Sequence, residues 1–537
     1  MPRLQLLRLL SAAFLALPFT VALSQSKTPP HPPTLWIIGD STAHIDAPAN
    51  AANPEPRVGW GTPLAAVFDP AKIRLVNAAK AGRSSRTYFT EKRWDQVIEQ
   101  LQPGDYVLIN FGHNDPGPID DAKGRGSLPG IGDDTQTVGP ADGTTETVHT
   151  FGWYLRTYIA GTRSRGATPI LLSVTPRNIW TDGKVEPGLG HFREWTAGVA
   201  RAENVDYVDL TGIVVREYQK LGPEKVAAFF PLDHTHTNLA GATLNARSVV
   251  AGLKALPDSP LNPYLSAEGE AVIRADEMSM PLPANAVLPT LWIIGDSTVR
   301  NGQGDGANGQ WGWGDEIAHW FRTNRINVVN RALGGTSSRT YFQFHWPSVL
   351  SMIRPGDFVL MQFGHNDNGP LDDAARARGT LPGNGEDART IDNPLTRKHE
   401  TVHSYGWYLR RLINQTRQHG ATPIVLSLIP RKTWDGDRIH REPYVEWARQ
   451  AAAESDKKGD RAFFVNLNEI IAQQYERMGQ AAVEPMFADP HTHTSLAGAQ
   501  LNAKSVIEGL KGLKHDPLKK YLSPESKSLP PFHESSH

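Results

Sequence analysis

The chain has 537 residues and a mass of 59.0 kDa, enough for two to four domains of ordinary size. Hydrophobic residues make up 39% and charged residues 21%, a composition typical of globular proteins and not of disordered or fibrous ones. Lys and Arg (55) nearly balance Asp and Glu (56), which excludes an overall field that attracts nucleic acid, and the absence of cysteine excludes disulfides, thiolate zinc sites and cysteine nucleophiles.

Residues 1–24 have the pattern of a secretory signal peptide. Arg3 and Arg8 precede an apolar run that ends in small residues near Ser24. Pro18 interrupts this run, which is shorter than the roughly 20 residues that span a bilayer, so cleavage is favoured over membrane anchoring. We therefore expect a secreted or periplasmic protein that has no membrane association after cleavage.

Five short apolar runs rich in branched residues predict buried strands in the first half of the chain. They span residues 35–39, 73–77, 105–112, 168–174 and 205–210. Longer segments with helical spacing of apolar residues, such as 93–101 and 152–163, lie between them. Strands that alternate with helices predict a three-layer α/β/α domain with a central, mainly parallel five-stranded sheet, whose ligand site lies beyond the carboxyl ends of the strands.

The chain is a tandem duplication. LWIIGDST occurs from Leu35 and Leu291, SSRTYF from Ser84 and Ser337, FGHND from Phe111 and Phe363, and HTHT from His234 and His491. The offsets of 252 to 257 residues are far longer than the 20–50 residues of a solenoid repeat. We expect two whole domains, at 33–265 and 288–523, joined by a linker at 266–287 and followed by a tail at 524–537.

Three motifs, GDST, the glycine block that contains Gly82, and GHND, each begin where an apolar run stops. Ser41 lies in a tight turn after Gly39, where a serine either exposes its hydroxyl and N–H at the sheet edge or caps a helix. Gly82 permits close backbone approach and a second N–H, or serves only as a turn glycine. Asn114 in GHND offers an amide donor to a developing oxyanion, or forms an Asx turn.

Near the end of the first domain, the sequence places a carboxylate close to a histidine. Asp233 and His236 lie on a loop that enters a helix predicted after Thr237. A spacing of three lets the carboxylate bond one imidazole nitrogen and leaves the other free to act as a base toward Ser41. A metal site of His234, His236 and an aspartate is the alternative, but a spacing of two sends the two rings to opposite sides, so we expect no metal and no cofactor.

These blocks resemble those of a known superfamily. GDS with Ser41, the glycine block with Gly82, GHND with Asn114 and DHTH with Asp233 and His236 are similar to the four signatures of the SGNH (GDSL-type) hydrolases. More narrowly, FGHND, AGRSSRT and DHTHTNLAGA resemble the rhamnogalacturonan acetylesterases of carbohydrate esterase family 12.

The resemblance covers nearly all of both domains. It implies a flavodoxin-like SGNH hydrolase fold and a metal-free serine esterase that removes acetyl groups from pectic polysaccharide. It also implies that Ser41 is the nucleophile, that His236 is the base oriented by Asp233, and that Gly82, Asn114 and the Ser41 N–H hold the oxyanion.

The same blocks give Ser297, Gly335, Asn366 and His493 as the site residues of the second domain. Aligning the two HTHT blocks puts Pro490 opposite Asp233, so the carboxylate of Asp489 is displaced by one residue. Either the loop bulges and Asp489 still reaches the ring of His493, or the base has lost its orienting partner. We therefore expect the first site to be active and rank it ahead of the second.

Four further residues occur at matching places in the two copies. Arg86 and Arg339 follow the glycine block and either bind uronate carboxylates or form a structural ion pair. His149 and His403 precede the GWYLR segment and either line the cleft, where we expect them to bind substrate, or make a helix-entry hydrogen bond.

A long acidic loop precedes each of these histidines. It runs from Pro116 to Glu146 and again from Asn368 to Glu400, and its length predicts a substrate-facing flap. Its acidic residues would repel a polyuronate, so acetylated neutral glycans such as xylan remain an alternative substrate. These acidic residues in the first copy are Asp120, Asp121, Asp133 and Asp134.

Three functions from different classes fit these observations. An exported carbohydrate O-acetylesterase is favoured, with an acetylated polysaccharide as its partner. A carbohydrate-binding protein with one or both sites inactive is the second, and a lipase-like esterase is the weakest because Arg, Asn, Asp and Trp flank the blocks. Labelling of Ser41 by a serine-reactive probe separates the first two. The sequence does not give the oligomeric state.

Overall fold

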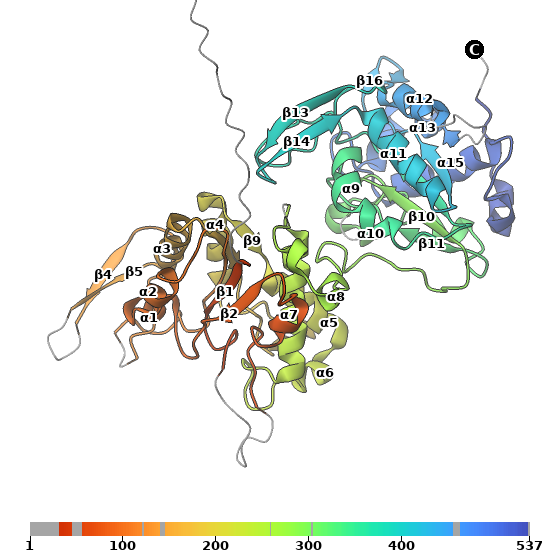
Figure 1. Cartoon of the computed structure of the whole chain (residues 1–537). Coiled ribbons are helices and arrows are strands. Elements are labelled where there is room, and N and C mark those ends of the chain that lie inside the picture. The colour runs from red at the N-terminus through yellow and green to blue at the C-terminus, as the bar shows by residue number, and fades with distance from the viewer. Residues whose placement is uncertain are drawn as a thin grey trace, which may run out of the picture. The chain divides into compact units, whose positions relative to one another are not determined.

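The chain forms two compact units, each with its own five-stranded parallel sheet (Figure 1). The computed structural model describes residues 32–45, 56–120, 123–139, 145–257, 259–301, 304–454 and 462–534. The first unit takes in the chain up to Val249 with Tyr264–Ala271, and the second takes in Val250–Pro263 with the chain from Val272. The predicted signal peptide lies outside the described residues.

The sheet of the first unit has the order β2-β1-β3-β6-β9, with all neighbouring strands parallel. In chain order this is 2-1-3-4-5, the arrangement of flavodoxin-like domains. The strands are β1 (Thr34–Gly39), β2 (Arg74–Asn77), β3 (Tyr106–Asn110), β6 (Thr168–Leu172) and β9 (Asp206–Val208).

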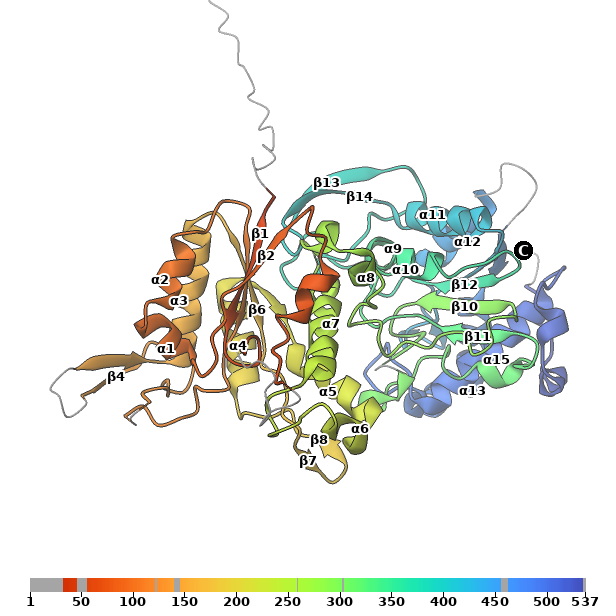
Figure 2. The ribbon, with the colours of Figure 1, turned by 60° about the horizontal axis from the view of Figure 1, so that its bottom comes forward.

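Helices cover both faces of this sheet, which confirms the predicted three layers. Aromatic and aliphatic residues of α1 to α4 pack on the face formed by Trp36, Ile38, Val107 and Ile109, and α5 with the first part of α7 lies on the other (Figure 2). The helices are α1 (Ser85–Thr90), α2 (Arg93–Ile98), α3 (Phe151–Ser164), α4 (Phe192–Glu203), α5 (Leu210–Leu221), α6 (Pro223–Ala227), α7 (Leu239–Ala255) and α8 (Ala267–Glu270).

The second unit repeats this architecture, with the strand order β11-β10-β12-β15-β18. Alternate side chains of β10 enter different layers: Leu291 and Ile293 pack with α13 and α15, and Trp292 and Ile294 pack with α9 to α12. The strands are β10 (Thr290–Gly295), β11 (Asn327–Asn330), β12 (Phe358–Gln362), β15 (Thr422–Leu426) and β18 (Phe463–Val465). The helices are α9 (Ser338–Phe344), α10 (Trp346–Leu350), α11 (Tyr405–Gln418), α12 (Tyr444–Glu454), α13 (Leu467–Met478), α14 (Gln480–Val483) and α15 (Leu496–Gly512).

All five predicted strands of the first domain are confirmed, but three of them end earlier than expected. The runs predicted at 105–112, 168–174 and 205–210 each pass two residues beyond β3, β6 and β9. Phe111, Val174 and Leu210 are buried like strand residues. They follow the last paired residues, where the chain leaves the sheet toward the site. Apolar content alone therefore does not mark the end of a strand.

Each long acidic loop contains an antiparallel hairpin. β4 (Thr135–Val138) pairs with β5 (Glu146–His149), and β13 (Ala388–Asn393) pairs with β14 (Lys398–His403). A smaller hairpin follows in each unit, β7 (Trp180–Thr181) with β8 (Lys184–Val185) and β16 (Trp434–Asp435) with β17 (Arg438–Ile439). Over the described part of the chain, no helix is long and apolar enough to cross a membrane.

Candidate active site

The candidate nucleophile follows the same strand in each sheet, β1 in the first and β10 in the second. Ser41 lies in the turn after β1, and only 8% of its surface is exposed. The buried carboxylate of Asp40 accepts the backbone N–H of Thr42 at 2.8 Å and also its hydroxyl, which fixes this turn. Ser297 follows β10 in the same way, and Asp296 accepts the N–H of Thr298 at 2.9 Å.

The structure brings the predicted base to the hydroxyl in the first domain. Nε2 of His236 lies 2.8 Å from Oγ of Ser41, although 195 residues separate them in the sequence. Nδ1 of the same ring lies 2.8 Å from Oδ2 of Asp233. A hydroxyl, an imidazole and a carboxylate in this order can activate the hydroxyl as a nucleophile.

The carboxylate of Asp233 also closes the loop that carries the base. Its Oδ1 accepts the N–H groups of Thr235 at 2.7 Å and His236 at 2.8 Å. Partial burial alone would raise the pKa of Asp233, but the hydrogen bonds from His236 and Thr235 outweigh burial and lower it to about 2. Asp233 is therefore ionised at neutral pH and can accept the hydrogen bond from Nδ1 of His236.

The second domain has the same arrangement despite the displaced carboxylate. Nε2 of His493 lies 2.8 Å from Oγ of Ser297, and its Nδ1 lies 2.5 Å from Oδ2 of Asp489. Oδ1 of Asp489 accepts three successive N–H groups, those of His491, Thr492 and His493, at 3.1, 2.7 and 3.0 Å. The loop with the extra residue turns its backbone N–H groups toward the Asp489 carboxylate. Asp489 therefore still reaches the ring of His493, which is the first of the two alternatives that the sequence left open.

The predicted oxyanion donors of the second domain, Gly335 and Asn366, line the same cavity as Ser297. Gly82 and Gly335 have φ values of +80° and +83°, a left-handed conformation that favours glycine. Nδ2 of Asn114 donates to the carbonyl of Arg83 at 3.0 Å, and Nδ2 of Asn366 donates to that of Thr336 at 2.8 Å. An amide nitrogen carries two N–H donors, so each asparagine keeps one for a substrate oxygen.

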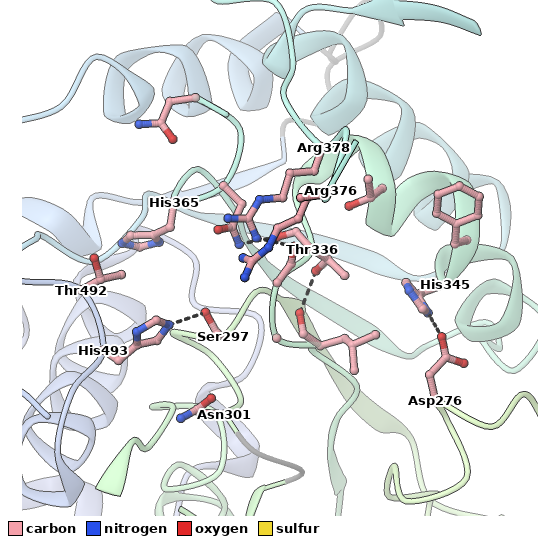
Figure 3. A pocket seen from close by; sticks show the side chains of 18 of the residues that line it. Asp276, Ser297, Asn301, Thr336, His345, His365, Arg376, Arg378, Thr492 and His493 are labelled. Atoms are coloured by element: carbon pink, nitrogen blue, oxygen red, sulfur yellow. Dashed lines mark hydrogen bonds and ion pairs between the residues drawn. The ribbon is translucent and has the colours of Figure 1, made fainter. Parts of the chain in front are cut away.

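These groups of the second domain surround one cavity of about 1010 Å³ (Figure 3). Ser297 and His493 lie on one side of it, and Arg376 and Arg378 project over it from the loop that follows β12. The volume is at the upper end of the range of ~300 to 1,000 Å³ for sites that bind small molecules, so it exceeds what an acetyl group alone needs. Leu395, in the turn of the β13–β14 hairpin, also lines it.

Arg86 and Arg339 form the structural ion pairs that the sequence left open as one of two alternatives. Arg86 is 2% exposed, its Nε and Nη2 each donate to Glu146 at 2.7 Å, and its Nη1 donates to two backbone carbonyls. Arg339 is fully buried and pairs with Glu400 in the same way. The ion-pair alternative therefore describes their role, because both guanidinium groups are occupied by acceptors of their own domain.

His149 and His403 are also held by their own helices. The ring of His149 stacks on Trp153 with centroids 3.7 Å apart, and that of His403 stacks on Trp407 at 3.9 Å. His403 is not among the residues that line the cavity of the second domain. Burial lowers the pKa of both imidazoles, which keeps them neutral at neutral pH.

Three arginines at the cavity were not singled out from the sequence. Arg378 donates to the carbonyl of Gly335 at 2.8 Å, and Arg431 donates to the Thr492 hydroxyl at 2.7 Å and to the carbonyl of His365. The third is Arg376. The repeat itself carried a signal for two of them, because Arg125 and Arg177 of the first domain match Arg378 and Arg431. Arg125 donates to Oδ1 of Asn114 at 2.8 Å.

A cluster of Asp276, Glu277 and His345 brings possible metal ligands within 4.8 Å of one another. Both carboxylates already pair with cations of the protein. Arg274 donates to Asp276 at 3.0 Å, and Arg331 donates to Glu277 at 2.9 Å. The cluster is therefore an ion-pair network, because a divalent cation would have to compete with two guanidinium groups.

A serine, histidine and aspartate at the carboxyl edge of a five-stranded parallel sheet define a serine hydrolase of the α/β/α class. The model of the GDSL-like lipase/acylhydrolase family matches residues 37–244 and again 293–501. The chain therefore belongs to this family, with the family domain present twice. It is a carboxylic ester hydrolase.

Three relatives of known name match the length of one domain. A rhamnogalacturonan acetylesterase of Emericella nidulans is 36% identical over 230 residues, which are 42% of this chain and 88% of that protein. A probable rhamnogalacturonan acetylesterase of Bacillus subtilis is 29% identical over 41% of this chain and 93% of its own length. A rhamnogalacturonan acetylesterase of the same species is 29% identical over 44% and 97%.

Proposed function

We propose that this protein is an exported carbohydrate esterase that removes O-acetyl groups from pectic rhamnogalacturonan, and that each of its two domains, at 33–265 and 288–523, carries an active site. The contacts from serine to histidine to aspartate in both domains are the observation that carries this proposal. The three relatives support the acetyl group and the pectic substrate, because they are rhamnogalacturonan acetylesterases by name.

The first site would act through an acetylated serine. Oγ of Ser41 attacks the acetyl carbonyl while His236 takes its proton and Asp233 stabilises the resulting imidazolium. The tetrahedral oxyanion accepts hydrogen bonds from the N–H groups of Ser41 and Gly82 and from the Asn114 amide, each typically worth about 3 kcal/mol of barrier. His236 then returns the proton to the departing sugar oxygen. A water molecule, activated by the same imidazole, releases acetate and restores the serine.

The cavity of the second domain supports an acidic glycan as substrate. Arg376 and Arg378 line it, and a guanidinium group fits a uronate carboxylate. Arg431 also lines it, but its guanidinium pairs with Glu442 at 2.9 Å. In the acidic loop of this domain, Asp373 accepts the N–H groups of Ala375 and Arg376 at 2.9 and 2.8 Å and so shapes the turn that carries the arginines.

Export is the part of the proposal that rests on the sequence alone. Residues 1–24 have a charged start, an apolar run and small residues at the end. If the leader is cleaved, the protein recovered from the periplasm or medium begins near residue 25, which N-terminal sequencing would show. Full-length protein retained with the cells would contradict export.

The experiment that tests the activity is acetate release from a panel of acetylated rhamnogalacturonan, acetylated xylan and a small acetyl ester. We expect release from rhamnogalacturonan to have the highest kcat/KM, and a fluorophosphonate probe to label both Ser41 and Ser297. Ser41→Ala and Ser297→Ala should each remove one label. Preference for acetylated xylan would overturn the pectic substrate, and the absence of both label and acetate would favour a carbohydrate-binding protein instead.

A further inference from the structure

The wall of the second domain's cavity opposite His493 comes from the segment that joins the two domains. Arg274 and Asp276 line the same cavity as Ser297 and His493. Thr340 and Phe344 of α9, and His345 directly after that helix, line it as well. Figure 3 shows Asp276 and His345 on the far side of the Thr336 turn from His493. The cavity therefore continues past the catalytic groups to a lip made by this segment.

A buried ion pair fixes the segment in place. Glu277 is 3% exposed, and its Oε2 accepts from Arg331 at 2.9 Å and from the hydroxyl of Ser348 at 2.6 Å. Arg331 is also 3% exposed and directly follows β11. Removing one partner would leave the other as an uncompensated buried charge, so this pair holds the segment in place before any ligand arrives.

The groups that this lip presents suit a sugar ring. The Asp276 side chain is 30% exposed and pairs through both oxygens with Arg274, at 3.1 and 3.0 Å, so the pair is neutral and keeps lone pairs for hydroxyl donors. The half-buried ring of Phe344 supplies an apolar face beside it. A carboxylate, a guanidinium group and an aromatic face together match the polar rim and the apolar face of a pyranose.

We propose that the segment Arg274–Glu277 forms a carbohydrate subsite of the second domain, which binds an uncharged sugar residue of the same glycan chain near the acetylated residue at Ser297. This inference rests on the proposed esterase function. The first domain has no matching anchor, because Ala78 occupies the position of Arg331 in the otherwise similar sequences NAA and NRA. The two domains consequently differ in the length of glycan that they recognise.

The test uses the full chain with Ser41→Ala, so that only the second site turns over. Asp276→Ala is added, and kcat/KM is measured for acetylated rhamnogalacturonan oligosaccharides and for 4-nitrophenyl acetate. We expect the ratio of the two values to fall about tenfold, mostly through KM, since the variant loses a hydrogen bond between the sugar and a charged group. Asp437→Ala, on the exposed β16–β17 hairpin, is the matched control and should leave the ratio unchanged.

A second variant tests the anchor. Arg331→Ala with Glu277→Gln removes both buried charges, gives the first domain's residue at position 331 and should lower the same ratio. An unchanged ratio in Asp276→Ala would overturn the subsite. If the Ser41→Ala protein hydrolyses neither substrate, the esterase function of the second domain fails. Titration calorimetry with the oligosaccharide then decides the subsite: weaker binding in Asp276→Ala supports it, and equal binding overturns it.

Discussion

The orienting carboxylate has two roles in each site. One oxygen bonds the imidazole, and the other gathers the N–H groups of the loop that carries it. Asp233 accepts two backbone N–H groups and Asp489 accepts three. The carboxylate therefore reaches Nδ1 of the histidine whether it lies three or four residues before that histidine. Residue spacing alone could not decide whether Asp489 reaches His493, because this depends on how many backbone N–H groups of the loop point toward the carboxylate.

This dual role predicts that Asp489 matters as much as Asp233. Asp489→Asn removes the charge that stabilises the imidazolium and should lower kcat of the second site by roughly 10⁴ while leaving KM little changed. Measured in the Ser41→Ala protein, the loss should equal that of Asp233→Asn measured in the Ser297→Ala protein. A loss below tenfold for Asp489→Asn would mean that the second base works without its carboxylate.

A buried carboxyl behind each site predicts a pH dependence of stability. Burial raises the pKa of Asp115 to about 7, although hydrogen bonds from Ser85 oppose the shift, and burial raises that of Asp367 to about 7 as well. The folded protein thus keeps protons that the unfolded chain releases near pH 4. The contribution of each carboxyl to the free energy of unfolding is fully present below about pH 4. It is lost as the pH rises through about 7, and the loss is at most about 4 kcal/mol for each carboxyl.

The variant Asp115→Asn cannot titrate at this position. We expect its free energy of unfolding to change less between pH 5 and pH 8 than that of the parent. Urea denaturation, followed over the unfolding transition of the first domain, measures this change. Asp120→Asn, in the exposed part of the neighbouring loop, is the control and should keep the parent's slope. Equal slopes in the parent and in Asp115→Asn would show that Asp115 ionises normally in the fold.

At the scale of elements, the glycine block ties two parts of each domain together. Helix α1 begins with a capping box of Ser84 and Thr87, and Arg86 in its first turn pairs with Glu146 in β5. The capping box is local and is visible in the sequence. The arginine's partner lies 60 residues further on in a hairpin that no local pattern announced. The sequence therefore left ion pair and substrate binding equally open for Arg86.

The ion pair predicts a larger stability loss in the second domain than in the first. Glu400 is 13% exposed and Glu146 is 37% exposed, so the pair with Arg339 is better shielded from water than the pair with Arg86. Arg339→Met should cost about 3 to 5 kcal/mol of unfolding free energy and Arg86→Met less, by urea denaturation. If Arg339 served substrate instead, Arg339→Met would keep stability and raise KM.

At the scale of the whole molecule, the duplication was the most informative feature of the sequence. Because every block occurs twice in the same order, it predicted two whole domains, and the serine and histidine of the second copy followed from those of the first. The lip at Asp276 did not follow, since it belongs to neither repeat and its anchor, Arg331, stands where the first copy has Ala78. Comparing the two copies predicts the features that they share, but it cannot predict a feature that only one copy has.

Each site is complete within its own domain, which predicts additive turnover on a small substrate. The Ser41 contacts involve Asp233 and His236, and the Ser297 contacts involve Asp489 and His493. Sites that share no partners usually act independently. The rates of Ser41→Ala and Ser297→Ala on 4-nitrophenyl acetate should therefore sum to the parent's rate, and the double variant should be inactive. A parent rate several times larger than the sum would show that one site depends on an intact serine in the other.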